Sequence, residues 1–154
     1  MSTLVEQMVG NELRQLGFKS ESSSWHRDVG EIIHVAGLQK SKWSSDYYIN
    51  LAVWIKSIAK DNAPDPSQCP LQCRIDAIPD NPEELVNALT EEDSWRMDPD
   101  HRNEVIKYAL CNADFMFFSK LKTLADVIGF LKASKWEQLA VDRELARLVS
   151  EKGD

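Results

Sequence analysis

A chain of 154 residues is long enough to form one domain that buries a core without metal ions or disulfide bonds. Its apolar fraction of 43% and charged fraction of 28% are typical of a soluble globular protein, and no apolar run reaches the roughly 18 residues of a membrane span. The net charge of −7 argues against a protein that binds nucleic acid by neutralising phosphates. We therefore expect a single domain over residues 1–154, with no membrane segment and no nucleic-acid partner.

The first segment of the chain has the periodicity of an amphipathic helix, and Gly17 follows it as a natural C-terminal cap. This pattern predicts a helix from about residue 3 to residue 16. The segment contains acidic residues and lacks the apolar stretch of a secretory signal, so we expect no export signal here. The apolar residues at helical spacing are Leu4, Val5, Met8, Val9, Leu13 and Leu16.

Strand-like patterns follow between residues 22 and 78. Two apolar pieces flank DVGE (28–31), where Gly30 permits a turn. The clearest strand covers residues 47–56, in which every odd position from 47 to 55 is apolar and the even positions are mixed, so one face of the sheet should be buried and the other only partly covered. After a loop rich in Pro, Asp and Asn, LQCRIDAI (71–78) predicts a fourth short strand that ends at Pro79.

The remainder of the chain has helical patterns with recognisable start signals. Asn81 with Pro82, Asp98 with Pro99, and Thr123 each predict a helix N-terminus, and Ser134 with Glu137 form a capping box. Because strands come first and helices after them, the order predicts an α+β fold rather than alternating βαβ units. We expect an N-terminal helix, a meander-like antiparallel sheet of about four strands, and about four C-terminal helices packed on that sheet.

Several short motifs are similar to the pattern of one protein family. Its most specific part is LQKSKW (38–43) followed by Y-x-I-N (47–50), and weaker matches continue through CRID (73–76), DSWRMD (93–98) and KLKTLADVIGFL (120–131). On these motifs the chain resembles an uncharacterised bacterial family, domain of unknown function 4304. The resemblance implies a small bacterial α+β protein, and it supplies no catalytic residue or ligand. The Cys- and Pro-containing stretch before CRID departs from the pattern.

The cysteine spacing does not support a metal site, and a search for catalytic motifs does not support an enzyme. Cys69 and Cys73 have a C-x3-C spacing that suits a metal ion, but no second pair of ligands has a matching spacing, and Cys111 stands apart. We therefore expect three free thiols in a reducing cytoplasm, no metal and no cofactor. The common phosphate-binding, zinc-protease and nucleophile-elbow motifs are missing from the sequence.

Two further groups of residues have a structural and a catalytic interpretation. His34 lies in an apolar strand-like run, where a hydrogen-bonded structural histidine is a simpler interpretation than a general base. The carboxylates around PDNPEE (79–84), together with Asp76, could form an acid–base pair. They fit the start of a helix better, because acids favour the positive end of the helix dipole. Catalysis is therefore not supported by the residues.

The connection QKSKW (39–43) is the candidate binding site. If it is the tip of a hairpin, its lysines and tryptophan project from the sheet, and the mixed face of the next strand adds further aromatic and amide groups. In the opposite interpretation the aromatic residues pack beneath the C-terminal helices and the lysines keep the loop soluble. The candidate residues are Lys40, Lys42, Trp43, Tyr48, Asn50 and Trp54.

The charge is uneven along the chain, and this asymmetry bears on the partner. Residues 18–60 contain six Lys and Arg against four acids, whereas residues 61–104 contain twelve acids against three Arg. The acidic stretch is either a set of solvated loops and helix starts or a patch that attracts a basic partner. Our first hypothesis is a protein-binding domain, such as an antitoxin-like or immunity protein that neutralises a basic toxin or nuclease. The alternative is a ligand-binding domain or enzyme that acts on a phosphorylated or nucleotide-like molecule through Lys40, Lys42, Trp43 and His34.

Overall fold

The computed structural model describes residues 3–21, 24–44, 46–58, 66–82, 84–90, 97–133 and 139–151. Within these ranges the strands form one antiparallel sheet in which each strand pairs with its neighbour in the sequence. The predicted meander is therefore confirmed. The strands are β1 (Lys19–Glu21), β2 (Ser24–Asp28), β3 (Ile32–Lys40), β4 (Tyr47–Ile55), β5 (Leu71–Arg74) and β6 (Ala140–Val141).

The number of strands corrects the prediction of about four, because the sheet has six. The four predicted strands correspond to β2, β3, β4 and β5. β1 is only three residues long and wholly polar, so its sequence carries no alternating pattern. β6 has two residues and pairs with Leu71 and Gln72 of β5, in a segment whose sequence predicted a helix. Both extra strands depend on pairing with a longer neighbour rather than on their own sequence.

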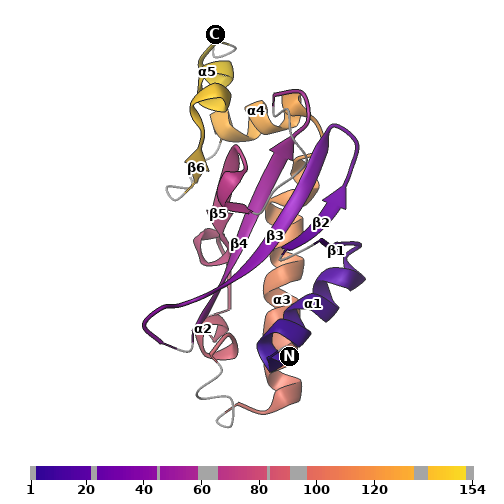
Figure 1. The fold of residues 1–154 in the computed structure, drawn as a ribbon, viewed down its shortest axis with the longest axis vertical. Coiled ribbons are helices and arrows are strands. Elements are labelled where there is room, and N and C mark those ends of the chain that lie inside the picture. Colours follow the sequence, from indigo (N-terminus) through magenta and orange to yellow (C-terminus); the bar gives the residue numbers. More distant parts are fainter. Residues whose placement is uncertain are drawn as a thin grey trace.

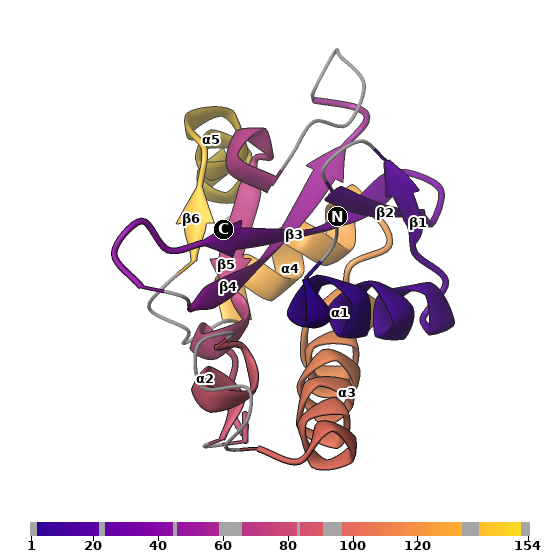
Figure 2. The same cartoon turned by 60° about the horizontal axis from the view of Figure 1, so that its bottom comes forward.

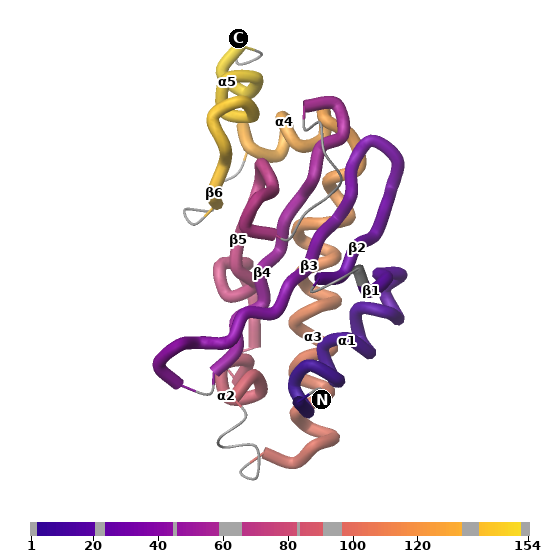
Figure 3. The backbone as a smooth tube through the Cα atoms, viewed as in Figure 1, coloured from indigo at the N-terminus to yellow at the C-terminus, as the bar shows by residue number. Residues whose placement is uncertain are grey.

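Three helices cover one face of the sheet. They are α1 (Leu4–Gln15), α3 (Pro99–Met116) and α4 (Leu124–Ala133), whose buried residues share the main core with the odd-numbered residues of β4. In Figure 1 α3 and α4 lie behind the strands and α1 lies beside α3, and Figure 2 shows α1 and α3 below the strands. Two others, α2 (Leu85–Ala88) and α5 (Arg143–Glu151), lie near opposite ends of the domain, as the chain trace in Figure 3 shows. None of the helices in the described ranges is both long enough and apolar enough to cross a membrane.

Three of the predicted helix boundaries agree with the structure. The Asp98 side chain accepts a hydrogen bond from the backbone N–H of His101 at 3.2 Å, at the start of α3. At the start of α4, the Thr123 hydroxyl accepts from the N–H of Asp126 at 3.0 Å. Gly17, just after α1, has a φ of +94°, a conformation that glycine adopts without the steric penalty that a Cβ would bring.

The predicted start of α2 is wrong. Its helical residues begin at Leu85, four residues after the expected cap Asn81, and the Asn81 side-chain amide instead donates to the carbonyls of Ile75 and, at 3.0 Å, Ile78. Asn81 therefore ties the turn after β5. The predicted capping box at Ser134 and Glu137 lies outside the described residues. α5 begins later, where the Asp142 carboxylate accepts from the N–H of Leu145 at 2.8 Å.

The two faces of the sheet are covered very differently. All five odd-numbered residues of β4 are at most 6% exposed and belong to the main core beneath the helices, as the alternating pattern predicted. The opposite face carries only a small apolar cluster of Val35, Ala52, Trp54 and Cys69, next to the 3₁₀ turn η1 (Pro66–Gln68). The rest of that face, toward the β3–β4 turn, is lined by polar side chains such as those of Gln39 and Asn50.

A buried polar network joins the sheet to the helical layer. Arg27 of β2 and His34 of β3 are opposite each other in the strand pairing, and the Arg27 Nε donates to His34 Nδ1 at 3.2 Å. The same guanidinium donates to the Leu16 carbonyl at 2.8 Å and forms an ion pair with Asp114 of α3 at 2.6 Å. Its carbon lies 4.6 Å from the centre of the Phe18 ring. One side chain therefore connects β2 with β3, the end of α1 and the last turn of α3.

The network determines the protonation state of His34. Because Nδ1 accepts from Arg27, the proton is on Nε2, which donates to the Leu121 carbonyl at 2.7 Å. The side chain is 1% exposed. Burial has the largest effect and, together with the nearby Arg27 charge, lowers the pKa of His34 to about 4, against the opposing effects of the hydrogen bond to the Leu121 carbonyl and of the Asp114 charge. His34 is thus a neutral structural residue.

Gly37 of β3 allows η1 to lie directly on the open face of the sheet. A Cβ added to Gly37 would lie 2.8 Å from Cγ and 3.0 Å from Cδ of Pro66. These atoms belong to a closed ring with little freedom to move away. Glycine at this position therefore permits the close approach of the strand and the turn.

We expect the stability of the protein to fall as the pH is lowered through the range in which His34 titrates. Its pKa is about 4 in the folded state and about 6.5 when unfolded, so the unfolded chain binds more protons between these values. The free energy of unfolding should decrease by about 2 kcal/mol from about pH 7.5 to about pH 5. Urea unfolding at both pH values measures this loss, and a His34→Gln variant should lose less over the same interval. An equal loss in both proteins would contradict the assignment.

A second prediction concerns the packing of Gly37. Gly37→Ala should lower the free energy of unfolding by about 1–3 kcal/mol, since the new methyl group overlaps the Pro66 ring. The matched control is Gly129→Ala in α4, where an added Cβ has nothing within 4 Å and should stabilise the helix by about 0.5–1 kcal/mol. Chemical unfolding of both variants tests the pair. Equal changes in the free energy of unfolding in the two variants would show that the contact with Pro66 does not make Gly37→Ala destabilising.

Candidate functional site

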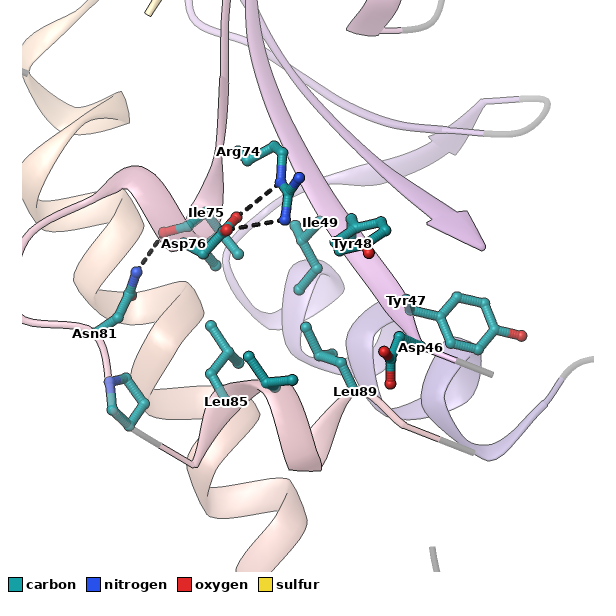
Figure 4. A pocket seen from close by; sticks show the side chains of 12 residues that line it. Asp46, Tyr47, Tyr48, Ile49, Arg74, Ile75, Asp76, Asn81, Leu85 and Leu89 are labelled. Carbon is teal, nitrogen blue, oxygen red and sulfur yellow. Dashed lines mark hydrogen bonds and ion pairs between the residues drawn. The ribbon is translucent and has the colours of Figure 1, made fainter. Parts of the chain in front are cut away.

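A cavity lies where β4 begins, between the end of β5 and α2. It has a volume of about 260 Å³. As Figure 4 shows, its lining comes from three segments that are far apart in the sequence. These segments are the start of β4 with the residue before it (46–49), the end of β5 with the turn after it (74–76), and the stretch through α2 (81–89).

A stacked aromatic–cation pair forms one wall of this cavity. The guanidinium carbon of Arg74 lies 4.1 Å from the centre of the Tyr48 ring. Arg74 also donates two hydrogen bonds to the Asp76 carboxylate, at 3.0 and 2.9 Å. Their side chains are about half exposed, so the ion pair contributes little to stability. Its effect is to hold the guanidinium flat on the ring.

The rest of the lining combines apolar walls with polar groups that accept hydrogen bonds. Buried Ile49, Leu85 and Leu89 form the apolar part, and Val86 at the rim is 62% exposed. Asn81 is the notable polar residue, because its side-chain Oδ1 is buried and has no hydrogen-bond partner in the described part of the chain. A buried acceptor without a partner is uncommon and needs a donor from elsewhere.

Asp46 supplies a second carboxylate, across the cavity from Asp76 in Figure 4. The hydroxyl of Thr90 donates to its Oδ1 at 2.5 Å, and that of Ser44 donates to Oδ2 at 3.0 Å. These bonds link the start of β4, next to the β3–β4 turn, to the end of α2. The Tyr47 N–H reinforces this link by donating to the Leu89 carbonyl at 2.9 Å. The hairpin and the cavity are therefore parts of one connected structure.

The predicted QKSKW connection is the tip of that hairpin. β3 and β4 pair up to Lys40 and Tyr47, and the turn beyond them projects from the body of the domain in Figures 1 and 2. Trp43 in this turn is 95% exposed. Lys40 and Lys42 are exposed beside it. A tryptophan so open to water is unusual, because its large ring gains free energy when it is buried.

The other predicted residues are divided between the two ends of β4. Tyr48 and Asn50 are half-buried on the open face, where the Asn50 amide donates to Gln39 at 3.0 Å. Trp54 corrects our expectation of an exposed side chain, since it is only 8% exposed and packs in the small cluster with Cys69. The reason is that η1 and the residues after it cover the face at this end of the strand and not at the other.

The structure does not bring His34 to the lysines of the hairpin tip. Its side chain lies in the buried network on the helical face, with its ring centre 4.7 Å from that of Phe118. Cys69 and Cys73 also point apart, because Cys73 belongs to the main core and Cys69 to the small cluster on the other face. Burial raises the pKa of the Cys73 thiol to about 12, which makes it a poor nucleophile.

The described side chains also form no group suited to binding a metal ion. Across the ranges that the structure describes, no three His, Cys, Asp or Glu residues are gathered as a metal site requires. What the cavity offers instead is an apolar channel with a carboxylate on either side and a buried acceptor. This combination suits a side chain with an apolar stem and a positively charged end, such as lysine or arginine.

Sequence reasoning missed most of the cavity. Arg74 and Asn81 were interpreted only as parts of a strand or of a helix start, and Asp76 only as a possible acid–base carboxylate or a helix-start acid. Asp46 and Val86 were not interpreted as site residues. The contact between Arg74 and Tyr48 depends on the pairing of Arg74 with Asn50 across β4 and β5. One signal was present, because Arg74 and Asp76 are two residues apart at the point where the strand ends.

Comparison with known proteins identifies a family and no characterised relative. No curated protein and no solved structure matches the chain. One family, described as Domain of unknown function (DUF4304), matches residues 9–112. This range runs from the middle of α1 to the middle of α3, so it includes β1 to β5, the hairpin tip and the whole cavity. Because the match covers more than half of the chain, the protein belongs to this family of domains of unknown function.

Proposed function

We propose that the domain binds another protein through a surface formed by the hairpin tip, the open face beside it and the cavity. We call this the tip-and-cavity surface, and the proposed partner is a basic protein. A role as an antitoxin-like or immunity protein, which neutralises a basic toxin or nuclease, is the form of this function that we favour. The residues of the surface outside the cavity wall are Lys40, Lys42, Trp43 and Asn50, and those of the cavity are Asp46, Tyr48, Arg74, Asp76, Asn81 and Val86.

The exposure of Trp43 is the observation that carries this proposal. An indole ring that is 95% exposed contributes nothing to the core of its own domain. Tryptophan is also the residue most enriched among the side chains that dominate protein–protein affinity, because it buries a large apolar area and still donates one hydrogen bond. A hairpin tip that exposes such a ring to solvent is well suited to enter a pocket on a partner.

The charge around the cavity supports a basic partner. Asp76, Asp80, Glu84 and Asp98 are exposed, in and after the turn that follows β5 and just before α2 and α3. In the described part of residues 61–104 the only Lys or Arg side chains are those of Arg74, which is paired with Asp76, and Arg102, which is fully buried. His101 is also basic, and its Nε2 lies 2.6 Å from the Glu84 carboxylate, which raises the pKa of His101 and offsets part of the Glu84 charge. The exposed surface is therefore acidic around a cavity whose own free groups are acceptors. Such a field increases the rate at which a positively charged partner associates.

The geometry favours a protein over a nucleotide-like ligand. The cavity of about 260 Å³ is smaller than the roughly 300–1,000 Å³ of typical small-molecule sites, and its size suits one side chain. Its lining carries two carboxylates against the single guanidinium of Arg74, which is already paired with Asp76, so the net charge of the lining disfavours a phosphate group. The histidine required by the alternative hypothesis lies on the other face of the sheet and is buried.

We expect Trp43→Ala to weaken binding of the native partner at least tenfold, which corresponds to about 1.4 kcal/mol or more. The partner is first captured from a lysate of the native host with immobilised wild-type protein and identified by mass spectrometry. Titration calorimetry then gives the dissociation constants of wild type and variant. Because the ring makes no core contact, circular dichroism should show that the variant keeps its fold. Leu4→Ala, at a 40% exposed apolar residue of α1, is the control.

Two results would overturn the binding surface. One is a Trp43→Ala protein that binds with unchanged affinity. The other is a Leu4→Ala protein that loses as much affinity as Trp43→Ala, since this would show a general effect of exposed apolar side chains. A partner that is acidic rather than basic would overturn the charge argument but not the role of the hairpin.

A further prediction isolates the electrostatic contribution. The double variant Asp80→Lys, Glu84→Lys should slow association with the partner at least tenfold at low salt, and should match wild type at about 1 M salt, where exposed charges are screened. The control has the same change in net charge on α5, as Glu144→Lys with Glu151→Lys. Stopped-flow or surface-plasmon measurements give the association rates. Equal slowing in both double variants would show that net charge alone, and not this surface, attracts the partner.

A further inference from the structure

The outward face of α3 carries an exposed aromatic stripe that is separate from the tip-and-cavity surface. Tyr108 is 56% exposed and Phe115 is 70% exposed, and between them lies Cys111, an exposed free cysteine. The spacing of three and then four residues places all three side chains on one side of a helix. They form what we call the α3 stripe. Burying rings this exposed against a partner is favourable, because it removes apolar surface from water.

The neighbouring faces of α3 are occupied. On one side the amide of Asn103 donates to Glu12 of α1 at 3.4 Å, and on the other side the amide of Asn112 donates to the Pro79 carbonyl at 2.9 Å. Arg102, Val105, Ile106, Ala109, Leu110 and Ala113 point into the core. The stripe is therefore on the side of α3 opposite its buried residues, and Figure 2 shows α3 at the periphery of the domain.

The charges at the two ends of the stripe have opposite signs. Asp100 and Glu104 are exposed near the start of α3, whereas Lys120 and Lys122 are exposed just after its end. A second copy placed parallel to the first would bring acid beside acid and base beside base. An antiparallel copy would bring the acidic end of each helix beside the basic end of the other, which is attractive at both ends.

We infer that α3 is the contact surface of a symmetric dimer, in which the stripes of two copies pack antiparallel about a twofold axis. Such an axis makes the same patch bind itself, and the charges at the two ends of this patch are self-complementary. Along a helix, Tyr108 and Phe115 are about 10 Å apart with Cys111 near the midpoint. Each Tyr108 therefore lies beside the Phe115 of the second copy, and the two Cys111 thiols lie close to the axis.

The position of Cys111 provides a direct test of this arrangement. It is the only exposed cysteine, since Cys69 and Cys73 are 3% and 5% exposed. A short bis-maleimide, which alkylates two thiols, should convert most of the wild-type protein to a covalent dimer at micromolar concentration. Cys111→Ser should abolish this product. Dilution distinguishes a preformed dimer from random encounters of monomers. The yield of the cross-linked dimer stays constant on dilution as long as the protein concentration remains above the dissociation constant of a preformed dimer, whereas the yield from random encounters falls.

Sedimentation equilibrium of the full chain gives the affinity itself. Phe115→Asp should raise the dimer dissociation constant at least tenfold, and Glu104→Lys should raise it severalfold. Adding Lys120→Glu to Glu104→Lys should restore most of the affinity, because the attraction returns with its signs exchanged. Trp43→Ala is the matched control and should leave the dissociation constant unchanged. Circular dichroism checks that each variant is folded.

Three outcomes would overturn the dimer. They are a wild-type protein that is monomeric throughout the concentration range, a dimer that Phe115→Asp leaves unchanged, and a double charge variant that is weaker than Glu104→Lys alone. The last outcome would also exclude the antiparallel orientation in particular. None of these results affects the proposed partner binding at Trp43, which is measured on a different surface.

Discussion

One-sided burial of the sheet is the constraint on which the other features of this domain depend. Every odd-numbered side chain of β4 points into the helical layer, so every even-numbered one must point away from it. With α1, α3 and α4 on the same face, the cover on the opposite face comes, among the residues that the structure describes, from η1. The strand is consequently buried on both sides at Trp54 and half open at Tyr48. The cavity lies at the start of β4, beyond the point where β5 stops pairing with it.

The Arg27 network fixes the position of the helical layer that produces this asymmetry. Isolated apolar packing would allow the helices to slide, because hydrophobic contact has no preferred direction. Hydrogen bonds from one guanidinium to Leu16, His34 and Asp114 have defined directions and join three elements at one point. Asp114 lies on α3 only three residues after Cys111, so the same bonds also determine which side of α3 faces away from the sheet.

Local rules predicted the elements with strong patterns and missed those that depend on distant partners. The alternation of β4 gave both the strand and its buried face, and Asp98 and Thr123 marked real helix starts. β6 could not be predicted, because a two-residue strand exists only through its pairing with β5. Asn81 is a residue type that often caps helices, but here its side chain hydrogen-bonds to the backbone of the turn after β5. The same limit applies to the site. The hairpin tip is formed by consecutive residues and could be predicted, whereas the cavity is formed by segments far apart in the sequence and could not.

The two surfaces have a consequence when they are considered together. The tip-and-cavity surface lies on the open face and at the hairpin, and the α3 stripe lies behind the helical layer, so one partner does not obstruct the other. A dimer through α3 would therefore present two copies of Trp43 at once. For a partner with two equivalent sites, the second contact forms at a high effective concentration set by the rigid spacing of the hairpins. Weak individual contacts would then be sufficient for tight capture, which is the property that neutralising a partner requires.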